Sequence, residues 1–419
     1  MPAIADVILA PAMGSFFYDD QAAIRSGLDH DGFDYVGTPV TPGFERVRQP
    51  ARALSIGLML DDGASVWGDM VSVQYSGAAG RDPLFDPEKI AVLADDILRP
   101  ELIGRQADEV QTNCDEVLDK ERPSPLPLAV KYGLSQALIA AAANTKQCTP
   151  AEIVCDAFGR PYPTVPIPIF AQSGDERYLN VDKMVLKKVD ILPHGLINSA
   201  EKFGPEGRTF SDYVEWVANR ATQLGGETYR PKLHFDLYGW IGLGIGDDPE
   251  KVASFIAQCA EKVPLFDLLI GSPVDYGERS LQIEKYAQIV SAMERIGTSA
   301  KIVADEHCNT FGDIRDFCDA KAAHVIQVKT PDVGSLLDTA SAIQYAKQSG
   351  VGAYCGGTSA ETDVSARACV HVALAMQANM MLAKPGMGVD EAICIVGNEQ
   401  SRALAQIRYN TSAQARNNG

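Results

Sequence analysis

The second part of the chain alternates short apolar runs with stretches of helical periodicity, and this alternation constrains the fold more than any other feature. The runs are Val165–Phe170, Val189–Leu192, Lys232–Leu237, Phe266–Ile270, Ala300–Ala304, Ala323–Val328, Val351–Tyr354 and, as a candidate eighth, Ala378–Leu382. Helical spacing of apolar residues is clearest between them at Asp212–Leu224, Pro249–Lys262, Leu281–Ile296 and Gly334–Gln348. About eight strand–helix units over ~240 residues are typical of a (β/α)8 barrel. A doubly wound sheet is the alternative, but no apolar run leads into G-x-G-x-x-G, so the sequence predicts the barrel.

The first 160 residues follow a different pattern, with strands before helices. Ala5–Ala10 is a predicted strand, and Ala53–Leu60 and Ala64–Val71 flank the turn signal Asp61-Asp62-Gly63, which predicts a β-hairpin. The aromatic and acidic segment Phe16–Asp20 is interpreted as a flap loop. Helices are predicted after the strands, at Pro87–Leu98, Ala107–Asp119, Gly133–Asn144 and Pro150–Phe158.

This change of pattern predicts two domains that meet at a turn-rich join. Gly159-Arg160-Pro161-Tyr162-Pro163 interrupts both helix and strand, so we place the boundary beside it. We expect an N-terminal α+β domain at residues 1–160 that closes over the mouth of a barrel at residues 161–419.

Composition narrows the classes of function. The formal net charge of −18 argues against nucleic-acid binding, which needs a basic face. No apolar run is long enough to span a bilayer and no basic signal peptide precedes one, so we expect no membrane association. The 9 cysteines, an odd number without CxxC or Cys/His clusters, are typical of reduced thiols and predict a cytoplasmic protein.

Polar residues follow most of the predicted barrel strands, where barrel enzymes carry their active sites. They are Gln172, His194, Asp236, Asp305 with Glu306, Lys329, and Thr358 with Ser359. Taken alone, each has a structural explanation: His194 as a hydrogen-bonded histidine, the acids as helix caps, and Gly356-Gly357-Thr358 as a turn. Six such ends in one predicted barrel favour a catalytic site.

These residue types point to one kind of chemistry. Two carboxylates on nearby strands, Asp236 and Asp305, favour a hard cation such as Mg²⁺. Lys329 lies on the same predicted face as Gln327 and is placed to remove a proton from carbon. A metal ion with a lysine or histidine base is the arrangement of the enolase superfamily.

At these residues the chain resembles the methylaspartate ammonia-lyase family of the enolase superfamily, over essentially its whole length. The resemblance is carried by Val73-Gln74-Tyr75-Ser76-Gly77, Gly80–Phe85, Phe170–Asp175, Leu192-Pro193-His194, Val303–Glu306, Cys308-Asn309-Thr310, Gln327–Asp332, Ala353–Thr358 and Leu382–Glu391.

The resemblance implies elimination of ammonia from L-threo-3-methylaspartate to give mesaconate, in a Mg²⁺-dependent, K⁺-stimulated homodimer. It implies that Lys329 takes the C3 proton and that His194 is the base on the opposite face. It implies metal ligation by Asp236 and Asp305. Residues expected to hold the carboxylates and amine are Gln172, Gln327, Thr358 and Ser359; Gln74, Phe170, Tyr354 and Leu382 are expected around the amine and methyl groups. Such a base must lose its proton near neutral pH, so we expect burial and Mg²⁺ to lower the pKa of Lys329.

The chain departs from the family at Gly271, which stands where the family has a glutamate as third metal ligand. Water, Glu306 or Asp275 then completes the metal shell, or metal affinity falls. Ser359 stands where the family can have cysteine, which we expect to be a mild change. Gly271 keeps open a second hypothesis, a non-catalytic or weakly active protein that binds dicarboxylates or amino acids. An enolase-superfamily enzyme with another acid substrate is a third.

Overall fold

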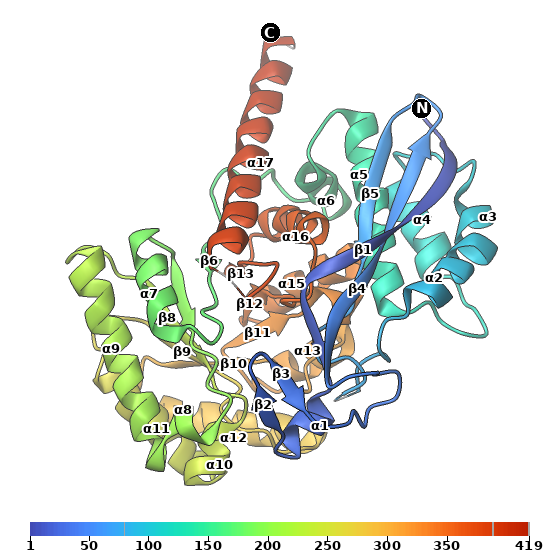
Figure 1. Cartoon of the computed structure of the whole chain (residues 1–419). Helices are drawn as coiled ribbons and strands as arrows, with labels where there is room; N and C mark the ends of the chain where they lie inside the picture. The colour runs from blue at the N-terminus through green and yellow to red at the C-terminus, as the bar shows by residue number, and fades with distance from the viewer. Residues whose placement is uncertain (79, 388, 418–419) are drawn as a thin grey trace.

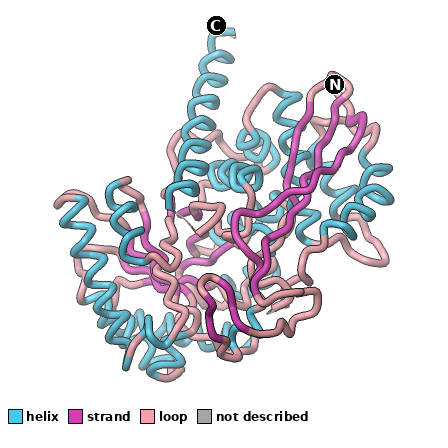
Figure 2. Tube along the Cα trace, in the orientation of Figure 1, coloured by secondary structure: helices cyan, strands magenta, loops and turns pink. Residues whose placement is uncertain are grey.

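The computed structural model describes residues 1–78, 80–387 and 389–417. Its N-terminal part is built on a three-stranded antiparallel sheet in the order β1-β4-β5, formed by β1 (Ile4–Asp19), β4 (Arg48–Leu60) and β5 (Ser65–Met70) (Figures 1 and 2). The predicted hairpin at Asp61–Gly63 is confirmed, since Met59 pairs with Ser65 across it. A small second hairpin joins β2 (Asp29–Asp31) to β3 (Asp34–Val36).

The first strand is much longer than the predicted Ala5–Ala10, and the flap loop predicted at Phe16–Asp20 is wrong. Residues up to Asp19 continue β1, with Phe17 opposite Pro50 and Asp19 opposite Arg48 on β4. Aromatic residues favour strands, and the Tyr18 side chain is buried beneath this end of the sheet. The acidic residues that resemble a loop composition are instead paired within the protein.

The N-terminal part also contains helices. They are α1 (Gln21–Arg25), α2 (Pro87–Leu93) continued by the π-helical η1 (Ala94–Leu98), α3 (Arg99–Leu102), α4 (Val110–Asn113) continued by η2 (Cys114–Leu118), α5 (Leu128–Lys146) and α6 (Pro150–Ala157). The four predicted helices of this region are therefore present, with two of them divided by a change of helix type. Of the helices in this part, α2, α3 and α5 contact the sheet.

The barrel prediction is confirmed: eight parallel strands close into a ring. They are β6 (Ile169–Phe170), β7 (Ile191–His194), β8 (Lys232–Asp236), β9 (Leu268–Gly271), β10 (Lys301–Ala304), β11 (Val325–Val328), β12 (Gly352–Cys355) and β13 (Met380–Leu382). The last is the candidate eighth strand of the sequence. Strand β6 is shorter than the predicted Val165–Phe170, because Pro166 and Pro168 have no N–H for a ladder bond.

Helices surround the barrel (Figure 1). They are α7 (Arg177–Leu186), α8 (Ala200–Phe203), η3 (Pro205–Gly207), α9 (Arg208–Gly225), α10 (Trp240–Ile245), α11 (Pro249–Glu261), α12 (Arg279–Ile296), α13 (Phe311–Asp319), α14 (Thr330–Val333), α15 (Leu336–Gln348), α16 (Asp363–Met376) and α17 (Val389–Asn417). The clearest predicted helices correspond to α9, α11, α12 and α15. Among the described residues, no helix is at once long and apolar enough to cross a bilayer.

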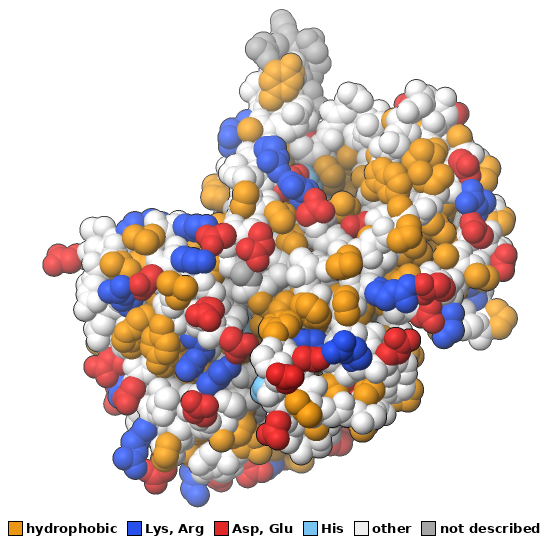
Figure 3. All heavy atoms as spheres, viewed as in Figure 1, with side chains coloured by type: hydrophobic (Ala, Val, Ile, Leu, Met, Phe, Trp, Pro, Cys, Tyr) orange, Lys and Arg blue, Asp and Glu red, His pale blue; other side chains and the backbone are white. Residues whose placement is uncertain are grey.

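The two parts share one apolar core, while a smaller cluster that includes Phe170, Leu269 and Tyr354 fills the barrel interior. On the face shown in Figure 3, acidic and basic side chains are intermixed. The division at residue 160 into two domains stays a prediction, and Asn418 and Gly419 of the second predicted domain lie outside the described residues.

The N-terminal sheet packs closely against α5 where two glycines, Gly68 and Gly133, face each other. A Cβ atom on Gly68 of β5 would stand 2.1 Å from the carbonyl oxygen of Gly133 on α5 and 2.8 Å from the backbone nitrogen of Ala137. Backbone atoms cannot move aside as a flexible side chain does, so this contact requires glycine.

We therefore expect Gly68→Ala to lower the free energy of unfolding by about 1–3 kcal/mol through overpacking. Gly312→Ala is the control, because the nearest atom to its added Cβ is Thr310 Oγ1 at 3.6 Å. Urea unfolding followed by circular dichroism compares the variants. Equal stability of Gly68→Ala and wild type would contradict the close backbone contact.

Candidate active site

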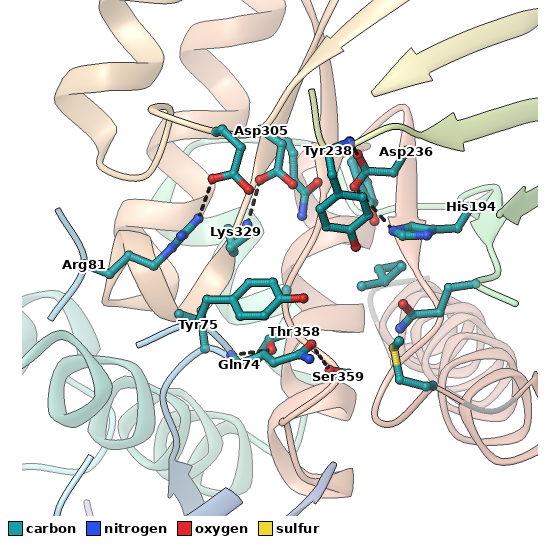
Figure 4. A pocket seen from close by; sticks show the side chains of 18 residues that line it. Gln74, Tyr75, Arg81, His194, Asp236, Tyr238, Asp305, Lys329, Thr358 and Ser359 are labelled. Atoms are coloured by element: carbon teal, nitrogen blue, oxygen red, sulfur yellow. Dashed lines mark hydrogen bonds and ion pairs between the residues drawn. The ribbon is translucent and has the colours of Figure 1, made fainter. Parts of the chain in front are cut away.

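A pocket opens at the carboxyl ends of the barrel strands and is closed by segments of the N-terminal part (Figure 4). From the barrel it is lined by Gln172, His194, Asp236, Tyr238, Asp305, Glu306, Gln327, Lys329, Tyr354, Gly357, Thr358, Ser359, Leu382 and Met387, and from the N-terminal part by Val73, Gln74, Tyr75 and Arg81. The sequence-predicted site residues thus come together here, with two exceptions, Phe170 and Gly271.

Lys329 forms the closest ion pair of the pocket. It follows the last residue of β11, and its Nζ lies 2.6 Å from Asp305 Oδ1 at the end of β10. In the protein without Mg²⁺, burial lowers the pKa of Lys329, but the carboxylates of Asp305, Glu306 and Asp332 together raise it by more. Burial likewise raises the pKa of Asp305, against the opposing effect of Lys329. The lowering of the Lys329 pKa by burial and bound Mg²⁺ stays a prediction.

His194 makes a parallel contact on the other side of the pocket. Its Nε2 lies 3.4 Å from Asp236 Oδ2, while its Nδ1 accepts a hydrogen bond from the backbone N–H of Leu196 at 3.3 Å. The imidazole therefore lies between a backbone donor and the Asp236 carboxylate. Burial raises the pKa of Asp236, but His194, His234 and the backbone N–H of Tyr238 together lower it by more.

Gly271 lies between the two carboxylates. In the strand register it is opposite Asp236 on β8 and Val303 on β10. A Cβ there would stand 3.5 Å from Asp236 Cγ and 3.2 Å from His234 Nε2. Position 271 is therefore directed at the acidic end of the pocket, and glycine leaves that space without a side-chain ligand.

Neither alternative third ligand named from the sequence joins the two carboxylates. Glu306 Oε2 lies 3.3 Å from Arg81, and Asp275 accepts from His307 at 3.1 Å and from Arg25 at 3.3 Å. Within the described residues, no group of three His, Cys, Asp or Glu side chains has the geometry to hold a metal ion. The acidic end of the pocket thus offers Asp236 and Asp305.

Arg81 joins the N-terminal part to the barrel from inside the pocket. Its side chain is buried, with Nε donating to Asp332 at 2.9 Å and Nη2 to Asn309 at 3.1 Å, in addition to the pair with Glu306. Burial raises the pKa of Glu306, but the charges of Arg81 and Lys329 together lower it by more. Glu306 is therefore committed to the arginine.

The opposite wall of the pocket carries amides and hydroxyls. Ser359 Oγ donates to Gln74 Oε1 at 3.0 Å, and the backbone N–H of Gln74 donates to Thr358 Oγ1 at 3.1 Å. Gln172 Nε2 donates to the carbonyl oxygen of Gly386 at 2.9 Å. These groups suit the carboxylates or the amine of a small polar ligand. Gly388, part of the motif quoted with Leu382, lies outside the described residues.

Phe170 lies beneath the pocket rather than in its lining. Its ring stacks on His234 with centroids 4.2 Å apart and contacts the Tyr354 ring edge-on at 5.4 Å. Burial lowers the pKa of His234 to about 3, so this imidazole is neutral. Phe170 therefore supports the apolar floor through Tyr354.

A second buried lysine supports the loop that carries Thr358. Lys384 Nζ donates to Glu361 Oε1 at 2.8 Å, to the carbonyl oxygen of Gly356 at 2.7 Å and to Thr330 Oγ1 at 3.1 Å. Glu361 Oε2 also accepts from Tyr132 of α5 at 2.7 Å. This network fixes the residue after Lys329 and the turn before Thr358 in one arrangement.

We expect Lys384→Met to lower the free energy of unfolding by about 3–5 kcal/mol, because it leaves the buried Glu361 carboxylate without its cation. Lys232→Met is the control, since Lys232 is half exposed and 3.6 Å from Asp267, and it should change stability by less than about 1 kcal/mol. Chemical denaturation measures both. Indistinguishable midpoints for the two variants would show that the buried pair does not stabilise the fold.

Sequence reasoning missed several residues that line the pocket. Tyr75 and Arg81 lie in quoted motifs without an assigned role, Glu306 was considered as a metal ligand alone, and Tyr238 follows Asp236 by two residues. Tyr238 follows the carboxyl end of β8, where barrel enzymes carry active-site residues. Its position in the sequence could therefore have indicated that it lines the pocket.

The fold and site together define a class of protein. A closed barrel with acids, a lysine and a histidine at successive strand ends, covered by a second unit, is the construction of barrel enzymes that use acid–base chemistry in a sheltered pocket.

Comparison with known proteins identifies the family within that class. The model of the methylaspartate ammonia-lyase N-terminus matches residues 2–159, and that of the C-terminus matches residues 162–409. The methylaspartate ammonia-lyase of Citrobacter amalonaticus is 46% identical over 97% of this chain and 99% of its own length. This chain therefore belongs to the methylaspartate ammonia-lyase family and is an ammonia-lyase.

Solved structures agree. The Citrobacter amalonaticus enzyme containing (2S,3S)-3-methylaspartic acid matches with a TM-score of 0.95 at 45% identity, covering 97% of this chain and 100% of that one. A Mg complex of β-methylaspartase from Clostridium tetanomorphum matches with a TM-score of 0.93 at 42% identity and the same coverage. Muconate lactonizing enzyme from Pseudomonas fluorescens shares the fold, with a TM-score of 0.59 at 17% identity over 89% of this chain and 85% of that one.

Proposed function

We propose that this chain eliminates ammonia from L-threo-3-methylaspartate to give mesaconate. The observation that carries the proposal is the convergence of Lys329, His194, Asp236 and Asp305 from successive strand ends on one covered pocket. The family membership supports it, as does the relative whose structure contains (2S,3S)-3-methylaspartic acid.

In this proposal each wall of the pocket has its own task. Lys329 takes the C3 proton, and His194 is the base for the opposite face of the substrate. Amide and hydroxyl groups hold the carboxylates and the amine: Gln172, Gln327, Thr358 and Ser359. The amine and methyl groups lie against Gln74, Tyr354 and Leu382, with Phe170 supporting Tyr354 from below.

A divalent cation fits the charges of the pocket. The lining contains Asp236, Asp305 and Glu306 against Arg81 and Lys329, so its acids exceed its bases before a substrate with two carboxylates enters. Mg²⁺ commonly uses one or two protein carboxylates and keeps several waters. We propose that Asp236 and Asp305 hold Mg²⁺, with water at the position beside Gly271. When bound, the ion would neutralise a substrate carboxylate and stabilise negative charge that develops next to it.

We expect Lys329→Ala to lower kcat by about 10²–10⁴-fold, the usual contribution of a general base. Because the reacting form is the unprotonated amine, kcat/KM should rise with pH until Lys329 has lost its proton. Mesaconate is followed by its ultraviolet absorbance in the presence of Mg²⁺.

The control for this measurement is Lys301→Ala. Lys301 is exposed and is the first residue of β10, at the end of that strand away from Asp305 and the pocket. This substitution should leave both the rate and the pH profile unchanged. Product formation by Lys329→Ala at the wild-type rate would exclude Lys329 as the base.

We expect Gly271→Glu to tighten Mg²⁺ binding by about tenfold or more, because it adds a third carboxylate beside Asp236. The added Cβ needs His234 to shift by a few tenths of an ångström, since the distance to its Nε2 is 3.2 Å. Calorimetric titration with MgCl₂ measures binding without turnover. Gly271→Gln is the matched control of equal size without charge, and equal affinities of the two variants would contradict a carboxylate-limited metal site.

Gly271 also favours a second candidate function, a protein that binds dicarboxylates or amino acids with little or no catalysis. In that case mesaconate binds in a calorimeter without Mg²⁺, and wild type forms no more mesaconate from 3-methylaspartate than Lys329→Ala does. Mg²⁺-dependent turnover by wild type would exclude this candidate.

We further propose a homodimer, activation by K⁺ and a cytoplasmic location. The outer part of α17 extends away from the rest of the chain and exposes Tyr409, which suits contact with a second copy (Figure 1). The 9 cysteines are free thiols, which fits a reducing compartment. Sedimentation tests the dimer, exchange of KCl for tetramethylammonium chloride tests the cation effect, and fractionation of cells tests the location.

A further inference from the structure

A chain of hydrogen bonds runs from an edge of the N-terminal part into the pocket. Arg48 donates to both carboxylate oxygens of Asp19 at 2.8 Å, and Gln74 Nε2 donates to Asp19 Oδ2 at 2.8 Å. Gln74 Oε1 in turn accepts from Ser359 Oγ at 3.0 Å (Figure 4). Asp19 therefore links a cation outside the pocket to an amide in its lining.

Backbone pairing holds the carboxylate in this place. Asp19 is the last residue of β1 and lies directly opposite Arg48, the first residue of β4, in the antiparallel ladder. Its backbone N–H donates to the carbonyl oxygen of Gln74 at 2.9 Å, and the residue is 1% exposed. The strand register thus places Arg48 beside the carboxylate, and the backbone hydrogen bond from Asp19 places Gln74 beside it.

This carboxylate decides which way the Gln74 amide is turned. An ionised carboxylate accepts hydrogen bonds and donates none, so the amide nitrogen must face Asp19. The amide oxygen then faces Ser359 and the pocket, where its second lone pair is free for a donor. Such a group attracts an ammonium or ammonia and disfavours a carboxylate.

We propose that Asp19 is a positioning residue that fixes the oxygen of the Gln74 amide toward the pocket and thereby selects the amine end of the ligand. This inference rests on the proposed lyase function for its ligand. Asp19 acts through Gln74 and does not line the pocket itself.

Arg48 connects Asp19 to the β2–β3 hairpin. Its guanidinium lies over the rings of Phe33 at 4.3 Å and Tyr35 at 4.8 Å, and its Nη1 donates to the carbonyl oxygen of Phe33 at 2.8 Å. The hairpin thus holds the arginine that holds Asp19.

The reverse reaction, addition of ammonia to mesaconate, separates the amine end from the carboxylate end. In Asp19→Asn the Gln74 amide loses the partner that fixes it, so KM for ammonia should rise about tenfold, the effect of one hydrogen bond to a charged group. KM for mesaconate should change less than about threefold. A general loosening of the fold would raise both values together, and that result would overturn the proposal.

Asp182→Asn is the matched control. Asp182 on α7 accepts from Nε and Nη2 of Arg220 at 2.6 Å and does not line the pocket, so the same loss of charge from an Arg–Asp pair should leave both KM values unchanged. A selective effect of Asp182→Asn on ammonia would also contradict a specific role of Asp19.

A double variant that exchanges the carboxylate and the amide between positions 19 and 74 tests whether the affinity for ammonia can be restored. Gln74→Glu alone places two carboxylates face to face and should raise KM for ammonia. Combined with Asp19→Asn it restores an amide N–H between the two side chains, keeps an oxygen toward Ser359 and conserves the net charge. The double variant should recover part of the affinity for ammonia, whereas additive losses would overturn the proposal.

Nuclear magnetic resonance tests the amide without catalysis. The side-chain NH₂ signal of Gln74, identified by its disappearance in Gln74→Ala, should exchange slowly with solvent in wild type and rapidly in Asp19→Asn. Equal exchange in both would overturn the proposal even in an active enzyme. Absence of turnover in wild type together with the expected exchange difference would reject the lyase function and retain the positioning role.

Discussion

The structure depends on the pairing of charges that are buried where the barrel meets the N-terminal part. An ion taken out of water is costly unless a partner of opposite charge and further hydrogen bonds replace its hydration. Arg81 accordingly meets Glu306 and Asp332, Lys384 meets Glu361, and Arg48 meets Asp19. The first of these sets connects residues distant in sequence, so it fixes the covering segment and the strand ends relative to one another.

The same rule governs the proposed base. Lys329 is buried, and the Asp305 carboxylate 2.6 Å from its Nζ compensates its charge. In the metal site we propose, that carboxylate serves both the lysine and the cation. Glycine at position 271 adds no charge to this shared set, so the site attracts a metal ion less than a site with a third carboxylate would, but also repels an anionic substrate less. Gly271 therefore changes the balance of two opposing requirements and not metal affinity alone.

The sequence predicted the barrel, the eight strands and the polar strand-end residues of the pocket from local pattern, whereas Gln74, Tyr354 and Leu382 were expected from the family resemblance alone. Strand–helix alternation is periodic, and parallel strands must present their carboxyl ends at one edge, so residues such as His194 and Asp236 are brought together by the fold class itself. Phe170 was misplaced because a strand of two residues leaves little information on which side is the floor. Strand β1 was cut short because acidic residues at its end resemble a loop when their partners are unknown.

Contacts between residues far apart in the sequence could not be predicted from local pattern. Nothing near Asp19 in the sequence indicates that Arg48 will lie opposite it, since the pairing arises from the register of a ladder between distant segments. The position of the pocket-lining residues from the N-terminal part therefore depends on this strand register. A one-residue slip of β4 against β1 would turn the side chain at position 48 to the other face of the sheet. The geometry at Gln74 is therefore a property of the N-terminal sheet as much as of the barrel, which explains why a substrate pocket at the mouth of a barrel requires a well-ordered second unit.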